Sequence, residues 1–179
     1  MPRTKLQGVV FGILMSITMA IGMEVYNVAV KMGYNAMPGG MSNMTGTVII
    51  QAFMEASYMW LFVFLFSNLW GNRIGHMIAD KIICPEKDSQ FFMILIRSSC
   101  TVLIMCPTMS MVATILFNII LGGASLWRLP TIWTGTVMKN FPMALLWNLF
   151  AAGPVTRWMF RILFADKTQA ENAVSKEAF

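Results

Sequence analysis

Four long apolar runs without a charged residue constrain the fold of this chain more than any other feature. They cover residues 6–23, 56–72, 98–127 and 140–156. A membrane-spanning helix needs about 20 mostly apolar residues, and each run reaches that length once a few flanking residues are added. The runs are apolar all round, whereas a helix of a soluble all-α protein would keep a polar face. The sequence therefore predicts an all-α integral membrane protein with four transmembrane helices, at about 7–31, 47–71, 93–121 and 132–157.

The composition agrees with a membrane location. Hydrophobic residues make up 57% of the 179 residues and charged residues only 12%, whereas roughly 25% of an ordinary globular domain is charged. The first run follows a basic start, but it is too long for the apolar core of a signal peptide, and no small-residue cleavage site closes it. We therefore expect it to be a helix of the mature protein.

The basic residues predict the orientation of the helices. One side of the membrane would carry Arg3, Lys5, Arg73, Lys81, Lys87, Arg97, Arg157, Arg161, Lys167 and Lys176, and the other only Lys31 and Arg128. The positive-inside rule places both termini and the 72–90 loop in the cytoplasm, and the 32–46 and 122–131 loops outside. Topology and contact with the lipid bilayer thus account for the net charge of +5, and no nucleic-acid partner is needed.

An internal similarity predicts two tandem helical hairpins. With the second half shifted by about 84 residues, Met54 aligns with Met138 and Glu55 with Lys139. The first and third helices align at a shift of about 91, which pairs Asn27 with Asn118. A two-helix repeat returns the chain to its starting side, so the repeats would be parallel rather than inverted; chance similarity between apolar segments is the alternative. We expect one structural domain, with a first hairpin and cytoplasmic loop at 1–90, a second hairpin at 91–165 and a cytoplasmic tail at 166–179.

Several short stretches resemble a known family. They are the basic start Pro2-Arg3, Gly22-Met23 ahead of Tyr26-Asn27, and the segment Cys106-Pro107-Thr108-Met109-Ser110-Met111-Val112-Ala113-Thr114. These residues resemble the bacterial membrane family known as domain of unknown function 2798, over most of the chain. The resemblance implies a small multi-pass protein of the bacterial cytoplasmic (inner) membrane and no particular activity. The 34–45 loop is longer than is typical of that family, and its role stays open.

Three ionisable residues mark a candidate site in the outer half of the membrane. Glu24, Glu55 and Lys139 each lie about seven or eight residues from the predicted outer end of a helix, which places them roughly 10–12 Å deep at 1.5 Å per residue. Charged groups at such depth are costly unless they are paired or hydrated. We expect them to share an outward-facing polar site for an unknown small solute or ion, with a carboxylate exchanging a proton. The remaining candidate members are polar neighbours, namely Asn27, Gln51, Tyr58 and Asn118, which Thr136 and Asn140 would extend.

Other interpretations of the same residues stay open. Glu55 and Lys139 would instead form an ion pair that only locks the hairpins together. A transporter or channel-like protein, expected to be a homo-oligomer such as a homodimer, has as its alternative a non-transporting protein that binds a partner or senses the envelope. A remote alternative is Cu(I) handling, through Met15, Met19, Met23, Cys106 and Met109.

Signatures of an enzyme are absent from the sequence. His76 is the single histidine, and no glycine-rich phosphate loop occurs. We expect neither catalysis nor a cofactor.

Overall fold

Four continuous helices form the part of the chain that the computed structural model describes, which is residues 4–32, 45–84, 88–123 and 125–164. The first is α1 (Lys5–Lys31), and the second runs through α2 (Gly46–Phe66), the π-helical η1 (Ser67–Gly71) and α3 (Asn72–Ile82). The third is α4 (Gln90–Ala113) with the π-helical η2 (Thr114–Ile120). The fourth comprises the short 3₁₀ helix η3 (Leu126–Arg128), α5 (Leu129–Trp147), the π-helical η4 (Asn148–Ala152) and helical residues 153–164. These ranges contain no strand.

Local sequence signals explain where the helices begin and end. Thr4 caps α1 through a capping box, in which its hydroxyl accepts from the Gln7 backbone N–H at 3.2 Å. Ser89 caps α4 by accepting from the backbone N–H of Phe92. Pro130 occupies the first turn of α5, where its missing N–H costs nothing. Gly123, at φ 64°, closes the third helix in a left-handed conformation that glycine adopts without strain.

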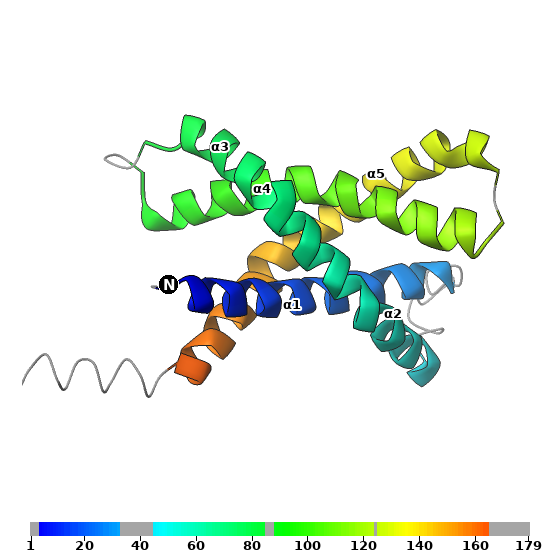
Figure 1. The fold of residues 1–179 in the computed structure, drawn as a ribbon, viewed down its shortest axis with the longest axis horizontal. Helices are drawn as coiled ribbons and strands as arrows, with labels where there is room; N and C mark the ends of the chain where they lie inside the picture. Colours follow the sequence, from blue (N-terminus) through cyan, green and yellow to red (C-terminus); the bar gives the residue numbers. More distant parts are fainter. Residues whose placement is uncertain (1–3, 33–44, 85–87, 124, 165–179) are drawn as a thin grey trace, which may run out of the picture.

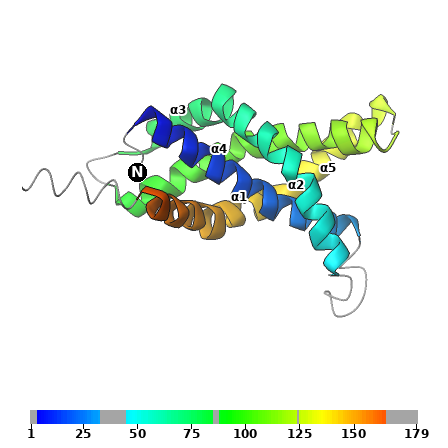
Figure 2. The same ribbon diagram turned by 60° about the horizontal axis from the view of Figure 1, so that its bottom comes forward.

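The helices alternate in direction, so their ends gather at two opposite ends of the bundle (Figures 1 and 2). At one end α1 finishes, α2 starts, η2 finishes and α5 starts; we call this the hairpin end. At the other, the terminal end, α1 and α4 start, α3 finishes and the described chain stops at residue 164. Consecutive helices pack together, α1 against α2, α3 against α4, and α4 against α5.

Small residues fill the inside of the bundle, and large apolar residues face outward. The buried positions are dominated by Ala, Gly, Ser and Thr, such as Ala52, Ala152 and Thr156. In contrast, Phe150 is 78% exposed and Leu61 57% exposed. A soluble core buries its large apolar side chains, whereas helices in a bilayer approach one another through small residues. The distribution is therefore that of a protein surrounded by lipid.

Three of the helices are long and apolar enough to cross a membrane, namely Lys5–Lys31, Gly46–Ile82 and Gln90–Ile120. The prediction of an all-helical membrane protein is confirmed to this extent. The fourth helix does not meet the same criterion of hydropathy among the described residues. Its sequence explains this, since Asn140, Pro142 and Asn148 interrupt its apolar run. Its membrane crossing stays a prediction, as does the tandem repeat.

At the terminal end, α3 and α4 pack closely against each other. A Cβ atom added to Gly75 of α3 would lie 2.9 Å from the Cα atom of Thr101 on α4, so the two backbones are in near contact. Arg97 and Asp80 join the same helices by a salt bridge of 3.2 Å. The predicted cytoplasmic loop at 72–90 begins as helix α3, which continues α2 rather than forming a separate element. The predicted outer loop at 34–45, apart from Thr45, and the tail at 166–179 lie outside the described residues.

Candidate functional site

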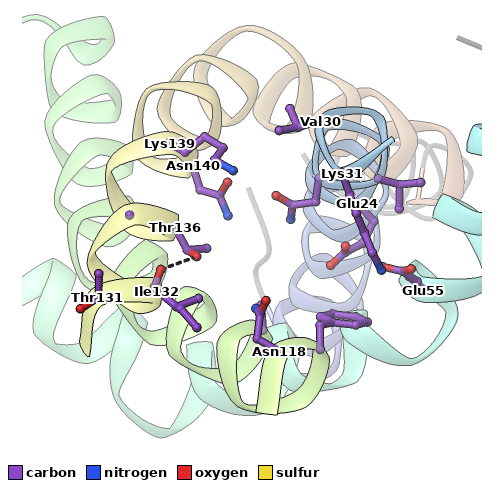
Figure 3. Close-up of a pocket in the computed structure, with 15 residues that line it drawn as sticks. Glu24, Val30, Lys31, Glu55, Asn118, Thr131, Ile132, Thr136, Lys139 and Asn140 are labelled. Carbon is purple, nitrogen blue, oxygen red and sulfur yellow. Dashed lines mark hydrogen bonds between the residues drawn. The ribbon is translucent and has the colours of Figure 1, made fainter. Parts of the chain in front are cut away.

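A half-open cavity of about 450 Å³ lies between the helices at the hairpin end (Figure 3). Its lining comes from α1, α2, η2 and α5, together with the last residue of α4. The volume lies within the roughly 300–1,000 Å³ that is usual for small-molecule sites. We call it the hairpin-end cavity, and it holds four ionisable side chains, Glu24, Lys31, Glu55 and Lys139.

One wall of the hairpin-end cavity is acidic. Glu24 of α1 is only 3% exposed, and its Oε2 atom has no hydrogen-bond partner among the described residues. The side chain of Asn27, one turn further along α1, hydrogen-bonds with Glu24. On α2, Glu55 accepts a hydrogen bond of 2.9 Å from Nε2 of Gln51. The two carboxylates are close enough for each to act on the other's charge, so this wall attracts cations and protons.

The opposite wall belongs to α5 and carries an ammonium and an amide (Figure 3). The side chain of Lys139 points into the cavity, and its Nζ makes no ion pair with a described residue. Asn140 is 4% exposed, and its Oδ1 lacks a hydrogen-bond partner in the described part of the chain. Thr136 also lines this wall, with its hydroxyl donating to the carbonyl of Ile132 at 2.7 Å.

Two local features set the position of these walls. Phe117 and Asn118 line the cavity from η2, a seven-residue π-helical segment, and π-bulges occur often at functional sites. The hydroxyl of Tyr26 on α1 donates to the backbone carbonyl of Lys139 at 3.3 Å. Deeper in the bundle, Nε1 of Trp147 donates to the carbonyl of Thr18 at 3.0 Å. These two bonds tie α5 to α1 beside and below the cavity.

The structure brings most of the predicted site residues together. Those that line the hairpin-end cavity are Glu24, Asn27, Glu55, Asn118, Thr136, Lys139 and Asn140. Gln51 does not line it but holds the carboxylate of Glu55. Tyr58 also lies outside the lining; it is 39% exposed and its ring packs against Phe117. The role of these residues in binding stays a prediction.

Lys31 is the ionisable residue of the cavity that the sequence interpretation missed. It was used only as one of the two basic residues on the outer side of the membrane. It lies seven residues after Glu24, a spacing of about two helical turns that places both on one face. Its Nζ lies 5.9 Å from the centre of the Phe117 ring. The seven-residue spacing from Glu24 could therefore have identified Lys31 as a member of the site.

The expected ion pair between Glu55 and Lys139 is not formed. Within the described ranges the structure has one salt bridge, between Arg97 and Asp80. In Figure 3 Lys139 lies on the α5 side of the hairpin-end cavity and Glu55 on the opposite side, with Glu24 and Lys31 of α1 between them in this view. The hypothesis of a direct ion pair that locks α2 to α5 is therefore wrong.

A second, narrower cavity of about 80 Å³ lies below the first and is lined by sulfur. Six of its fifteen lining residues carry sulfur, namely Met19, Met23, Met59, Met105, Cys106 and Met109. Methionine and cysteine together account for 21 of the 179 residues, so sulfur is concentrated here. We call it the sulfur cavity. Met15, the fifth residue of the copper alternative, lies apart from it and accepts from the hydroxyl of Thr156.

A third cavity of about 260 Å³ lies towards the terminal end and again contains charged and polar side chains. It is lined by Ser16, Asn72, His76, Arg97 and Asn148, among others, and Oδ1 of buried Asn148 has no partner among the described residues. Glu24 and Asn140 line both the hairpin-end and the sulfur cavity. Met19 and Met105 line both the sulfur and this terminal-end cavity. The three cavities therefore follow one another between the helices.

Comparison with known proteins returned no significant match to a protein-family model, to a curated protein or to a solved structure. The resemblance to the family known as domain of unknown function 2798 therefore stays an expectation from the sequence.

Proposed function

We propose that this chain is a small multi-pass protein that moves a solute or ion across a bacterial cytoplasmic membrane. The observation that carries the proposal is the succession of three cavities from the hairpin end to the terminal end. The first and third contain charged and polar side chains within a mixed lining, whereas the middle one is narrow and largely apolar. Polar sites on both sides of an apolar constriction are what a transport pathway requires, since the constriction gates passage while the sites hold the solute.

The proposed topology has four transmembrane helices, with both termini in the cytoplasm and the hairpin end facing outward. The fourth helix crosses the membrane with its polar side chains turned inward, which the burial of Asn140 and Asn148 supports. Intramembrane polar residues normally face the bundle interior or a water-filled cavity. The two hairpins derive from one duplicated unit, and in support of this the second helix of each contains a π-helical segment, η1 and η4.

The active form is a homo-oligomer, most simply a homodimer. Four helices alone rarely enclose a complete pathway, so a second copy would shield its open side. Gly8 and Gly12 form a GxxxG pattern on α1; a Cβ on Gly8 would meet nothing within 4 Å, whereas one on Gly12 would lie 3.4 Å from the Phe64 ring of α2. The Gly8 end of this side of α1 is thus open to a helix of another copy. Cross-linking in native membranes that yields only monomers would overturn this part of the proposal.

Flux measurements in liposomes test the transport proposal. Protein reconstituted with an internal pH-sensitive dye should show solute-dependent proton movement when amino acids, amines, organic anions or monovalent cations are added. Glu24→Gln and Glu55→Gln should abolish this flux, because each removes a carboxylate of the acidic wall. Lys81→Met is the matched control, since it removes an exposed charge of α3 outside the three cavities. No flux above empty liposomes, with a stoichiometric partner in a native pull-down, would favour the non-transporting alternative.

A second candidate function is the handling of Cu(I), which the sulfur cavity favours. Soft thioether and thiol ligands select Cu(I), and α1, α2 and α4 all contribute sulfur to one small space. Methionine is also a common apolar filler, so metal binding has to be measured. Purified protein should then bind about one Cu(I), and Met105→Leu with Met109→Leu should weaken that binding. Absence of copper after anaerobic loading would eliminate this candidate.

A further inference from the structure

The charges of the hairpin-end cavity balance without pairing. Two carboxylates, Glu24 and Glu55, and two ammonium groups, Lys31 and Lys139, line the same space. None of the four forms a salt bridge with another within the described residues. Lys31 lies over the Phe117 ring and near enough to Glu24 to act on its charge. Lys139 has no such neighbour, so its charge faces the cavity alone.

Two buried acceptor atoms are left without donors on opposite walls of this cavity. They are Oε2 of Glu24 and Oδ1 of Asn140, on side chains only 3% and 4% exposed. A buried acceptor without a donor is costly and rare in folded proteins. Both residues also line the sulfur cavity below, so the two acceptors mark the floor of the hairpin-end cavity. The N–H donors of a bound group, such as an ammonium, would satisfy acceptors of this kind.

Lys139 requires an anionic partner, and it lies nearer the mouth of the hairpin-end cavity than the two acceptors. It is exposed and lines only the hairpin-end cavity, whereas its neighbour Asn140 is buried and reaches the sulfur cavity as well. An anionic group beside the Lys139 ammonium would complete a charge-assisted hydrogen bond. The two requirements are thus separated by depth, with a donor group needed at the floor and an anion needed above it.

We propose that the hairpin-end cavity binds a small zwitterion, with its ammonium between Glu24 and Asn140 and its carboxylate beside Lys139. The proposal rests on the transport function above and names the class of its substrate. A simple amine would leave Lys139 unpaired and close to a second positive charge. A simple carboxylate would meet the acidic wall instead. The cavity therefore selects against both singly charged relatives, since like charges in one site are repelled.

Binding to the purified full-length protein tests the charge requirement directly. The probes are unbranched amino acids from glycine to 6-aminohexanoate, compared with n-butylamine and butanoate by isothermal titration calorimetry in detergent. We expect at least one amino acid to bind about 10-fold or more tightly than either singly charged compound, as expected for a charge-assisted contact. Equal affinity for the amine and the amino acids, or no binding of any amino acid at millimolar concentration, would overturn the proposal.

Two substitutions should change the specificity in opposite ways. Lys139→Met should weaken amino-acid binding by about 10- to 100-fold and leave n-butylamine binding unchanged or stronger. Glu24→Gln should weaken the binding of both compounds, because it removes the charge that holds the ammonium. Lys81→Met should change neither, as it lies outside the cavity. A variant that merely unfolds would lose both ligands together, so the preserved amine binding of Lys139→Met distinguishes a site from a structural role.

The outcomes separate this proposal from the transport function. Zwitterion binding without flux in liposomes would overturn transport and leave the site intact. Flux of another solute, with no zwitterion bound, would overturn the substrate class and leave transport intact.

Discussion

The α3–α4 contact at the terminal end and the α5 wall at the hairpin end differ in how closely neighbouring helices approach. At the terminal end, Gly75 brings α3 so near to α4 that a single added carbon would meet the Thr101 backbone. At the hairpin end, a Cβ on Gly135 of α5 would meet nothing within 4 Å. The charges follow the same division, because Arg97 and Asp80 are paired while Glu24 and Lys139 are not. The comparison shows that α3 and α4 are closely joined at the terminal end, whereas the hairpin-end cavity holds polar atoms without partners among the described residues.

The largest expected effect comes from the two glycines that define this contrast. Gly75→Ala should destabilise the protein by about 1–3 kcal/mol, because the added carbon would meet the Thr101 hydroxyl and two backbone atoms of Thr101 that cannot rotate away. Gly135→Ala should stabilise it by up to about 1 kcal/mol, because alanine favours the helix and finds empty space. Thermal unfolding in one detergent measures both. If both variants shift stability in the same direction, the two ends do not differ in packing.

A second expected effect concerns the unsatisfied carboxylate of the hairpin end. Glu24→Met should raise the free energy of unfolding by about 1–2 kcal/mol, because it removes a buried oxygen that has no donor. The same substitution should abolish flux and ligand binding. Unfolding in detergent and the liposome assay, applied to one preparation, measure the two effects. A loss of stability would mean that Glu24 holds the fold rather than a ligand.

A smaller effect is expected at the paired charges of the terminal end. Asp80 and Arg97 are 60% and 49% exposed in their side chains, and exposed ion pairs contribute about 0.2–1 kcal/mol. Asp80→Asn should therefore lower stability by no more than that, and less at high salt. Flux should not change. A loss of several kcal/mol, independent of salt, would show that this salt bridge contributes a large part of the stability at the terminal end.

The sequence predicts much of this fold because the membrane leaves few choices. Long apolar runs can only be helices there, since every backbone group must be bonded within its own segment. The cavity residues could also be identified from the sequence. An ionisable residue within an apolar segment, such as Glu24, is costly to bury and therefore indicates a polar site. Lys31 was missed because its position near a helix end has an ordinary explanation in topology.

Other features depend on packing that the sequence does not encode locally. The separation of Glu55 from Lys139 follows from how α2 and α5 are placed around the cavity, whereas the alignment of the two sequence halves predicts only that the two residues lie at similar depth. The sulfur cavity likewise includes Met59 of α2, a helix from which the copper alternative named no residue. The π-helical segments have no marker in the sequence, although Pro107 and Pro142 lie about two turns before two of them.

The smallest expected effect is the interaction energy between Glu55 and Lys139, and it tests the open hairpin end most directly. Glu55→Gln, Lys139→Met and the double variant form a cycle measured by unfolding in detergent. Because the two side chains make no salt bridge across the cavity, we expect their effects on stability to add within about 0.3–0.5 kcal/mol. A lock between the hairpins would give a larger coupling and a double variant that recovers both stability and function. Additive stability with flux lost in all three variants would show that the two charges act on the solute rather than on each other.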